Sequence, residues 1–395
     1  MKLLVATDAH IFETADGKHW TPAIYGYSFW LRYLNVFDSV RIVARTKKIS
    51  KLSGKELLVD GPGVEIYPLP FYQGPRELIK VYARTHKVLM NVANGCDVAL
   101  FRLPSQTAQM AYYHVKGKLP IGGEIVYDPT DDLKNKKLRL GVRLLSTITS
   151  YNLKKFCKEA NGVSYVTKET IQRNYPSAAR IFGESSLYFE TYYSTITLYE
   201  KSFGSPRNYK GSSSLKLCLS DVAMNSERKG ERILINAVKQ ARERGYDISA
   251  IIIGDGTMRS VFEELSKKLN LSEAITFTGR LASADEVRKV LETVDMFVFP
   301  TQAEGLPRGI LEAMALGLPV LSTPVGGIPE VIDSKYLFAP DDAEGFADMI
   351  CHLVKNQDEL TQMSADNFKK ACEFSNTILQ RRRDLFYKKL LDLRS

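Results

Sequence analysis

The sequence predicts an α/β protein with two domains, each built from alternating strands and helices. Strand-like runs at 2–7, 39–44, 97–101, 124–128 and 162–166 alternate with helical patterns at 24–36, 76–92, 105–117, 138–158 and 168–174. A second alternation starts at Leu215 and continues to about residue 355. Alternation of this kind is typical of parallel βαβ units. With 395 residues and 44% hydrophobic content, the chain can bury two cores.

The boundary between the domains is predicted at residues 211–214, a serine-glycine run with the composition of a linker. We therefore expect a first Rossmann-like domain over 1–210 and a second over 211–375. A last helical segment follows at 376–395.

The composition excludes several classes of protein. The cysteines are odd in number and scattered, so they indicate neither a disulfide framework nor a zinc site; they are Cys96, Cys157, Cys218, Cys351 and Cys372. No apolar run approaches the roughly 20 residues that span a bilayer. The start, MKLLVATDAH, lacks the apolar block of a signal peptide. We expect a cytoplasmic protein without a structural metal or a cofactor.

The positive charge is concentrated in the first half of the chain. Residues 1–210 hold 30 Lys plus Arg against 18 Asp plus Glu, whereas residues 211–395 hold 24 against 27. A basic half suits an anionic membrane surface or a polyprenyl-pyrophosphate acceptor. In residues 134–158, apolar positions near helical spacing lie between basic clusters, so this stretch either lies on a membrane or packs as an ordinary helix with a solvated face. No nucleic-acid-binding motif accompanies the charge.

The most specific pattern is VFPTQAEGLPRGILEAMALGLPVLSTPVGGIPEVI at 298–332. It predicts a buried strand, a turn at 305–307 and a short helix that ends near Gly317. The start of such a helix favours a diphosphate, and a glycine in the turn leaves room for it. Glu304 in the loop and Glu312 inside the helix could accept hydrogen bonds from two sets of hydroxyls, as a sugar and a ribose require. Taken alone, the two glutamates also fit a solvated surface pair.

This segment resembles the signature of the retaining GT-B glycosyltransferases of glycosyltransferase family 4, the glycosyl transferases group 1. Two glutamates with seven residues between them, followed by EAMALGLPVLSTPVGGIPEVI-like sequence, carry the resemblance, which covers residues 214–333. It implies that Glu304 contacts the donor sugar, that backbone amides of Gly305, Leu306 and Pro307 contact sugar and phosphate, and that Glu312 holds the ribose.

The resemblance extends to a basic cluster that ends in Lys-Gly. Arg228 and Lys229, at the start of an amphipathic helix, would neutralise the donor diphosphate. The arginine that the family often carries five or six residues before this lysine is replaced by Met224 or Ala223, so Arg228 could substitute for it. Gly254 and Gly256 match the family's Gly-Asp-Gly turn. Arg280 and Leu281 match the loop beside the nucleotide base.

The resemblance implies a GT-B fold, in which two Rossmann-like domains face a cleft and the last helix, 376–395, packs back on the first domain. It also implies a metal-independent, retaining hexosyltransferase that uses a nucleotide-sugar, with UDP the commoner base, to build cell-surface polysaccharide or glycoconjugate. DPTDD at 128–132 lacks the Asp-x-Asp spacing of metal-dependent GT-A enzymes. The alternatives are a non-catalytic GT-B scaffold or regulatory subunit, a GT-B phosphorylase and a sugar-nucleotide epimerase.

No family motif carries over to the first domain, which is expected to bind a glycan or lipid-linked acceptor. Position alone selects candidates there, because residues that follow parallel strands line the ligand-binding edge of a sheet. These candidates are Asp8, His10, Gly26, Arg102 and Asp128. Each also fits a loop or cap role.

Overall fold

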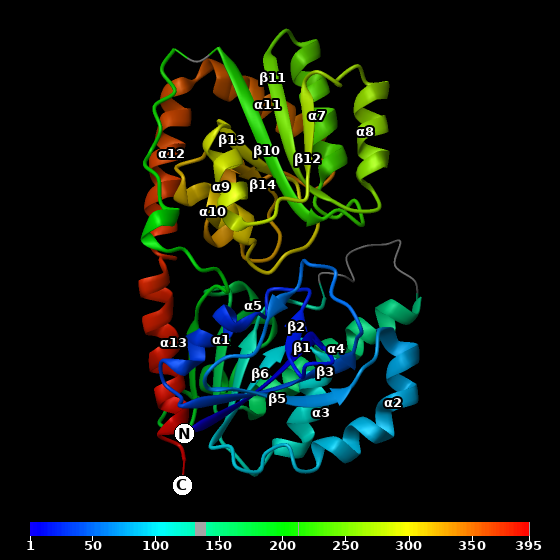
Figure 1. The fold of residues 1–395 in the computed structure, drawn as a ribbon. Coiled ribbons are helices and arrows are strands. Elements are labelled where there is room, and N and C mark those ends of the chain that lie inside the picture. The colour runs from blue at the N-terminus through cyan, green and yellow to red at the C-terminus, as the bar shows by residue number, and fades with distance from the viewer. Residues whose placement is uncertain (131–139, 212, 395) are drawn as a thin grey trace. The chain divides into compact units, whose positions relative to one another are not determined.

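The computed structural model describes residues 1–130, 140–211 and 213–394, and the chain divides into two compact units (Figure 1). The first unit comprises Met1–Tyr193 together with Gln380–Ser395, and the second comprises Ser194–Leu379. Each unit holds one sheet whose main strands are parallel. The predicted α/β class is confirmed.

The first unit is built on strands β1, β3 and β5 to β9, with β2 and β4 added at one end of β1. Its strands are β1 (Lys2–Glu13), β2 (His19–Thr21), β3 (Ser39–Lys48), β4 (Leu57–Leu58), β5 (Val64–Pro70), β6 (Val98–Leu103), β7 (Ile121–Ile125), β8 (Gly162–Tyr165) and β9 (Phe189–Tyr192). Its helices are α1 (Tyr27–Leu34), α2 (Gly74–Leu89), α3 (Gln106–Val115), α4 (Leu140–Glu159), α5 (Thr170–Asn174) and α6 (Ala178–Phe182). The parallel strands run in the order β5-β3-β1-β6-β7-β8-β9.

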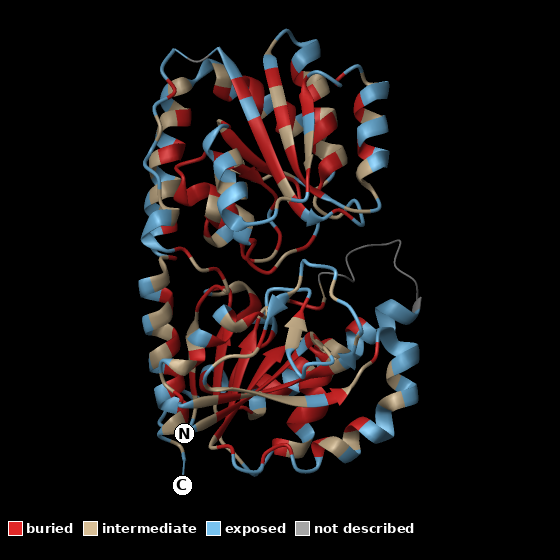
Figure 2. Ribbon diagram, viewed as in Figure 1, coloured by how far each residue is buried: buried red, intermediate tan, exposed pale blue. Residues whose placement is uncertain are grey.

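The strands at the centre of this sheet are buried along their whole length and are mostly apolar, apart from Arg102 in β6, Glu124 in β7 and Ser164 in β8. Every residue of β6, VALFRL, is buried, and so is every residue of β7 and β8 (Figure 2). A strand of a parallel sheet has helices on both faces and therefore needs a continuous apolar run. Burial of these side chains supplies the main driving force for folding of the unit.

The last helix, α13 (Asn376–Leu391), contributes its residues from Gln380 onward to the first unit. The Gln380 amide donates a hydrogen bond of 2.9 Å to the Arg32 carbonyl oxygen, and the Tyr387 hydroxyl donates one of 2.8 Å to Glu124. A Cβ at Gly122 would lie 2.5 Å from Leu390, so this glycine in β7 makes room for the helix.

The second unit has a sheet in the order β12-β11-β10-β13-β14, in which every strand pair is parallel. Its strands are β10 (Ser214–Ala223), β11 (Asp247–Asp255), β12 (Ile275–Gly279), β13 (Met296–Phe299) and β14 (Val320–Ser322). Its helices are α7 (Glu231–Glu243), α8 (Arg259–Lys268), α9 (Ala284–Glu292), α10 (Arg308–Ala315), α11 (Ala343–Lys355) and α12 (Gln357–Cys372), followed by the start of α13.

The boundary between the units differs from the predicted one. Residues 194–210, assigned from sequence to the first domain, belong to the second unit. The reason is a set of hydrogen bonds from this segment to the rest of the second unit, which the composition of the segment does not reveal. The Arg207 amide donates one of 2.7 Å to the Ser364 hydroxyl, and the Tyr209 hydroxyl donates one of 2.7 Å to the Asp295 carbonyl.

Two strands of the first unit also differ from the sequence prediction. Strand β5 was missed because Pro68 and Pro70 interrupt its pattern, yet it pairs with β3 along 64–70. Strand β7 is Ile121–Ile125 and not 124–128. The prediction placed it too late in the chain because the two glycines of this strand resemble a turn. Among the described helices, none combines the length and apolarity needed to cross a membrane.

Candidate functional site

The predicted donor residues lie in two loops that follow neighbouring strands of the second unit. Strand β10 pairs in parallel with β11 on one side and with β13 on the other. The chain moves outward from β10 in opposite directions, so the sheet has its topological switch point between β10 and β13 (Figure 1). Ligands of open α/β sheets bind at such a point, beyond the carboxyl ends of the strands.

The two loops are packed directly against each other. The Gln302 amide donates a hydrogen bond of 2.9 Å to the Arg228 carbonyl oxygen. Gly230 has a φ of 88°, and a Cβ at this position would lie 2.3 Å from the Pro300 carbonyl oxygen. Only glycine fits both the left-handed backbone and this approach. The Lys-Gly step is therefore required for the β10 loop to lie on the β13 loop.

This packing brings Lys229 and Glu304 together. The Lys229 ammonium forms an ion pair with the Glu304 carboxylate and lies 5.4 Å from the centre of the Phe299 ring. Burial lowers the pKa of Lys229 to about 8; nearby Asp221 opposes this shift and Arg228 adds to it. An ammonium that is partly desolvated gains more from a phosphate than one in bulk water.

The loop that carries Glu304 is held by the double glycine further along the chain. The Gly327 amide donates a hydrogen bond of 2.6 Å to the Gly305 carbonyl oxygen. Gly326 has a φ of 53°, and a Cβ there would lie 1.9 Å from the Glu304 carbonyl oxygen. The GG pair of the signature thus fixes the position of the Glu304–Gly305 backbone.

Helix α10 begins at Arg308, one residue later than predicted, with Pro307 as its N-cap. Pro307 makes no side-chain cap hydrogen bond, so the first amides of the helix remain available to an anion. Glu312 is half-buried in this helix, and burial raises the pKa of its carboxyl, with Arg308 opposing the shift. Leu306 is buried in the turn between Glu304 and the helix.

The Gly-Asp-Gly turn after β11 packs on the loop after β10. A Cβ at Gly254 would lie 1.6 Å from the Asp221 carbonyl oxygen, and one at Gly256 would lie 2.4 Å from the Met224 carbonyl oxygen. These glycines allow backbone to approach backbone, which is a structural role beside any contact with a donor. Arg280 and Leu281 follow β12, the edge strand; Arg280 is exposed and Leu281 half-buried.

In the first unit, Asp8 and His10 lie at an irregularity in β1, where the register with β3 shifts between Ala6 and His10. Asp8 is exposed and forms an ion pair of 3.4 Å with Arg45, a residue of β3 that sequence reasoning missed. Burial lowers the pKa of His10, and Arg45 adds to that shift. Bulges of this kind often redirect side chains next to binding sites. These residues remain candidates for contact with an acceptor.

Arg102 does not present its guanidinium to solvent. It is 6% exposed and forms an ion pair with Glu124, which is also buried. The Tyr33 and Tyr193 hydroxyls each donate a hydrogen bond of 3.0 Å to the Glu124 carboxylate. The geometry corrects the acceptor assignment of Arg102: its partners give it a structural role inside the unit.

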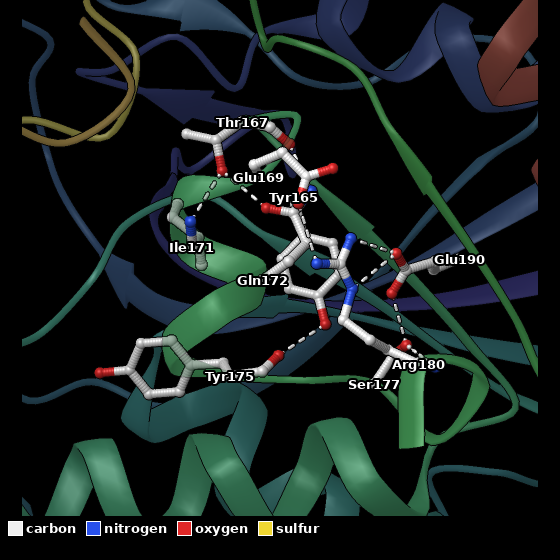
Figure 3. Close-up of polar contacts among 9 residues, drawn as sticks. All are labelled: Tyr165, Thr167, Glu169, Ile171, Gln172, Tyr175, Ser177, Arg180 and Glu190. Carbon is white, nitrogen blue, oxygen red and sulfur yellow. Dashed lines mark hydrogen bonds and ion pairs between the residues drawn. The ribbon is translucent and has the colours of Figure 1, made fainter. Parts of the chain in front are cut away.

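Asp128 is likewise occupied by structural hydrogen bonds. Its carboxylate accepts a hydrogen bond of 2.6 Å from the Tyr175 hydroxyl and one of 2.8 Å from the Asn174 amide. Tyr175 also accepts, through its carbonyl oxygen, a 2.7 Å hydrogen bond from Tyr165 (Figure 3). Burial and these partners correct the prediction of Asp128 as an acceptor ligand. The rest of its DPTDD segment, Asp131 and Asp132, lies outside the described residues.

Figure 3 shows how the segment after β8 is held together. Arg180 bridges the carboxylates of Glu169, at 3.0 Å, and Glu190, at 2.9 Å. Thr167 accepts a hydrogen bond from the Ile171 amide and donates one of 2.9 Å to Gln172.

Gly26, the remaining acceptor candidate, is the N-cap of α1, and a Cβ there would lie 2.8 Å from Leu57. Packing accounts for this glycine.

Sequence reasoning missed three charged neighbours of Lys229: Asp221 at the end of β10, Glu231 at the start of α7 and Arg308 at the start of α10. The sequence feature that could have identified Glu231 is its position as an acidic residue directly after Lys229-Gly230.

Within the described ranges, no three metal-ligating side chains of His, Cys, Asp or Glu are grouped closely enough to hold a metal ion.

Comparisons with known proteins bear on the fold and on the class of protein. Residues 217–356 match the family model of the glycosyl transferases group 1. Protein CapJ of Staphylococcus aureus is 24% identical over 99% of this chain and 97% of its own length. The amylovoran biosynthesis glycosyltransferase AmsK of Erwinia amylovora is 29% identical over 40% of this chain and 42% of its own length. HepE from Anabaena, solved in complex with UDP-glucose, is 16% identical over 100% of both chains, with a TM-score of 0.65.

The fold and the site define a GT-B protein, as predicted. Within that class, residues 217–356 carry the match to the glycosyl transferases group 1, and the chain is a glycosyltransferase.

Proposed function

We propose that this glycosyltransferase transfers a sugar from a UDP-sugar to a glycan or lipid-linked acceptor with retention of the anomeric configuration. The observation that supports this best is the ion pair between Lys229 and Glu304 at the switch point of the second sheet. One side chain supplies the positive charge that a diphosphate requires, and the other the acceptor atoms that sugar hydroxyls require.

In the proposed reaction, Lys229 and Arg228 stabilise the charge that develops on the departing diphosphate. The first amides of α10 add to this, because they point out of the helix end without a side-chain cap. Glu304 exchanges its contact with Lys229 for hydroxyls of the donor sugar. Glu312, a turn further into the helix, takes the ribose.

Retention follows if the acceptor hydroxyl attacks the face from which the diphosphate leaves and gives its proton to the leaving phosphate oxygen. No protein nucleophile is needed in this scheme, and Glu304 orients the sugar without acting as a base. We also propose that the reaction requires no metal ion, because Lys229, Arg228 and Arg308 supply the positive charge near the diphosphate.

The relatives suggest the kind of product. AmsK is a glycosyltransferase of amylovoran biosynthesis, and HepE was solved with UDP-glucose. We propose by analogy that the present chain uses a UDP-sugar and acts in the synthesis of a polysaccharide or glycoconjugate. The non-catalytic scaffold is not favoured, since Glu304, Glu312 and Lys229 are all present in the second unit.

We further propose that α4 brings the enzyme to an anionic membrane, where a lipid-linked acceptor would lie. The burial of the first half of this helix is inverted: Ser146 and Ser150 face the protein, whereas Leu144 is 62% and Tyr151 is 69% exposed. An ordinary packed helix shows the opposite distribution. Exposed basic side chains accompany the apolar ones, as membrane-surface helices require; they include Arg143, Lys154, Lys155 and Lys158.

The experiment is a panel of UDP-, GDP- and ADP-sugars incubated with the purified protein in EDTA. Thermal shift reads binding, and release of free sugar reads slow donor hydrolysis. We expect one UDP-sugar to stabilise the protein and to be hydrolysed, and Glu304→Ala to abolish the hydrolysis. Binding without turnover would favour the scaffold, and no binding by any donor would contradict the assignment.

A further inference from the structure

Glu231, the first residue of α7, is completely buried beside the proposed diphosphate subsite. Among the described residues, neither of its carboxyl oxygens has a hydrogen-bond partner. It follows Lys229 and Gly230 directly, at the point where the β10 loop turns into the helix (Figure 1). An ionised carboxylate is costly in such a place, because burial has removed the water that would stabilise its charge.

A second carboxyl group lies next to it. Asp221, near the end of β10, is 6% exposed and interacts with Glu231. Two adjacent buried carboxyls avoid ionising together, and one of them holds the proton. Burial, together with the neighbouring Asp221 carboxyl, raises the pKa of Glu231 to about 8, while Lys229 opposes the shift. At pH 7 Glu231 is therefore mainly in its neutral form.

The charged groups around Glu231 and Asp221 determine how strongly the subsite attracts an anion. Lys229 and Arg228 come from the β10 loop, Arg308 from α10 and Glu304 from the β13 loop. When Glu231 ionises, a third carboxylate joins those of Asp221 and Glu304. A nucleoside diphosphate, which is an anion, is therefore attracted more strongly while Glu231 is neutral.

We propose that Glu231 is a positioning residue of the diphosphate subsite: as a neutral acid paired with Asp221, it leaves the positive charge of Lys229 to the donor diphosphate, and its ionisation weakens donor binding. The proposal rests on the proposed function, since it assigns a diphosphate to this subsite. It also explains why a buried acid follows Lys229-Gly230 directly. If this position had only a structural role, an apolar residue would be more stable there.

The test is the pH dependence of UDP binding, measured by isothermal titration calorimetry at pH 7 and pH 9. Glu231→Gln keeps the shape of the neutral acid and cannot ionise. The matched control is Glu243→Gln, which makes the same change on the same helix at an exposed residue paired with Lys239. Deprotonation of the Lys229 ammonium weakens binding in all three proteins as the pH rises, so the comparison isolates Glu231.

We expect Glu231→Gln to bind UDP at pH 7 within about threefold of the wild type. Between pH 7 and pH 9 the Kd of the wild type and of Glu243→Gln should rise up to about tenfold more than that of Glu231→Gln. The same pH dependence in wild type and Glu231→Gln would overturn the proposal alone. Failure of the wild type to bind UDP, GDP or ADP would overturn the proposed function with it.

A measurement on the wild type alone covers the case in which the variant does not fold. At pH 8, Lys229 can take up at most about half a proton when UDP binds, because half of it is already charged. Calorimetry in two buffers of different ionisation enthalpy gives the total number of protons that the protein takes up when UDP binds. We expect an uptake of close to one proton; an uptake of about half a proton or less would leave none for Glu231 and would overturn the proposal.

Discussion

The Lys229 ammonium contacts the Glu304 carboxylate across two loops that follow adjacent parallel strands. The contact depends on residues that carry no charge: Gly230 lets the first loop lie on Pro300, and Gly326 lets a third segment lie on the Glu304 backbone. Both charged groups are therefore held before a donor arrives. A site assembled in advance loses little conformational entropy when it binds.

Replacing Glu304 by Gln should reduce turnover by about 10²–10³, since the side chain keeps its size but loses the charge that orients sugar hydroxyls. The measurement is kcat for donor hydrolysis, with the Kd for UDP as a second readout. UDP binding should remain within a few fold, because Glu304 is assigned to the sugar. Glu264→Gln, at an exposed position of α8, is the matched control. Equal turnover in both variants would contradict the role of Glu304.

Replacing Lys229 by Met should weaken UDP binding by about 10- to 100-fold, as expected for loss of a charge-assisted contact to phosphate. Methionine has a side chain of similar length to place beside Phe299, so packing should change little. Lys239→Met on the same α7 helix is the control. The affinity for uridine, which lacks the diphosphate, should be unchanged; a parallel loss for uridine would indicate a general disturbance of the loop.

Glu231→Gln should raise the free energy of unfolding at pH 7. The folded-state pKa of Glu231, about 8, is raised above its ordinary value of 4.5. The contribution of the acid to stability is therefore complete below about pH 4.5 and is lost as the pH rises toward 8, a loss on the order of 3 kcal/mol at pH 7. Thermal melts at pH 5 and pH 8 should show a larger gain in Tm at pH 8. A gain that does not depend on pH would contradict the buried acid.

The sequence predicted the second unit better than the first, for a physical reason. In the second unit the candidate site is shaped by backbone geometry, and the glycines and prolines that permit it are visible as a local pattern from Glu304 to Gly327. In the first unit, candidates were chosen only by their place after a strand. Arg102 was selected this way, and its partner Glu124 lies on another strand, so no local pattern could reveal that the guanidinium is buried.

Glu231 escaped prediction for a related reason. An acidic residue in the first turn of a helix is ordinarily a favourable, solvated partner of the helix dipole. That Glu231 is instead buried against Asp221 depends on how β10 and α7 pack, which neither sequence segment shows by itself.

Replacing Arg102 by Met should destabilise the protein by about 3–5 kcal/mol, because Glu124 would keep a buried charge without its cation. Tyr387→Phe, which removes one hydrogen bond to Glu124, should cost about 1–2 kcal/mol. Chemical denaturation measures both, with Arg84→Met on the exposed side of α2 as the control. If Arg102 instead served the acceptor, its loss would raise the acceptor KM and leave the unfolding midpoint unchanged.

The inverted burial of the first half of α4 gives a prediction on membrane contact. Ile148→Asn removes an exposed apolar side chain, whereas Thr147→Asn changes its exposed neighbour without loss of comparable apolar surface. Because neither substitution alters charge, a difference between them reports insertion of the apolar face. We expect Ile148→Asn, and more so a double variant with Leu144→Asn, to reduce co-sedimentation with phosphatidylserine vesicles by about threefold to tenfold at low salt. Binding that is equal in all variants would assign the attraction to the basic side chains alone, and no binding by the wild type would contradict membrane contact by α4.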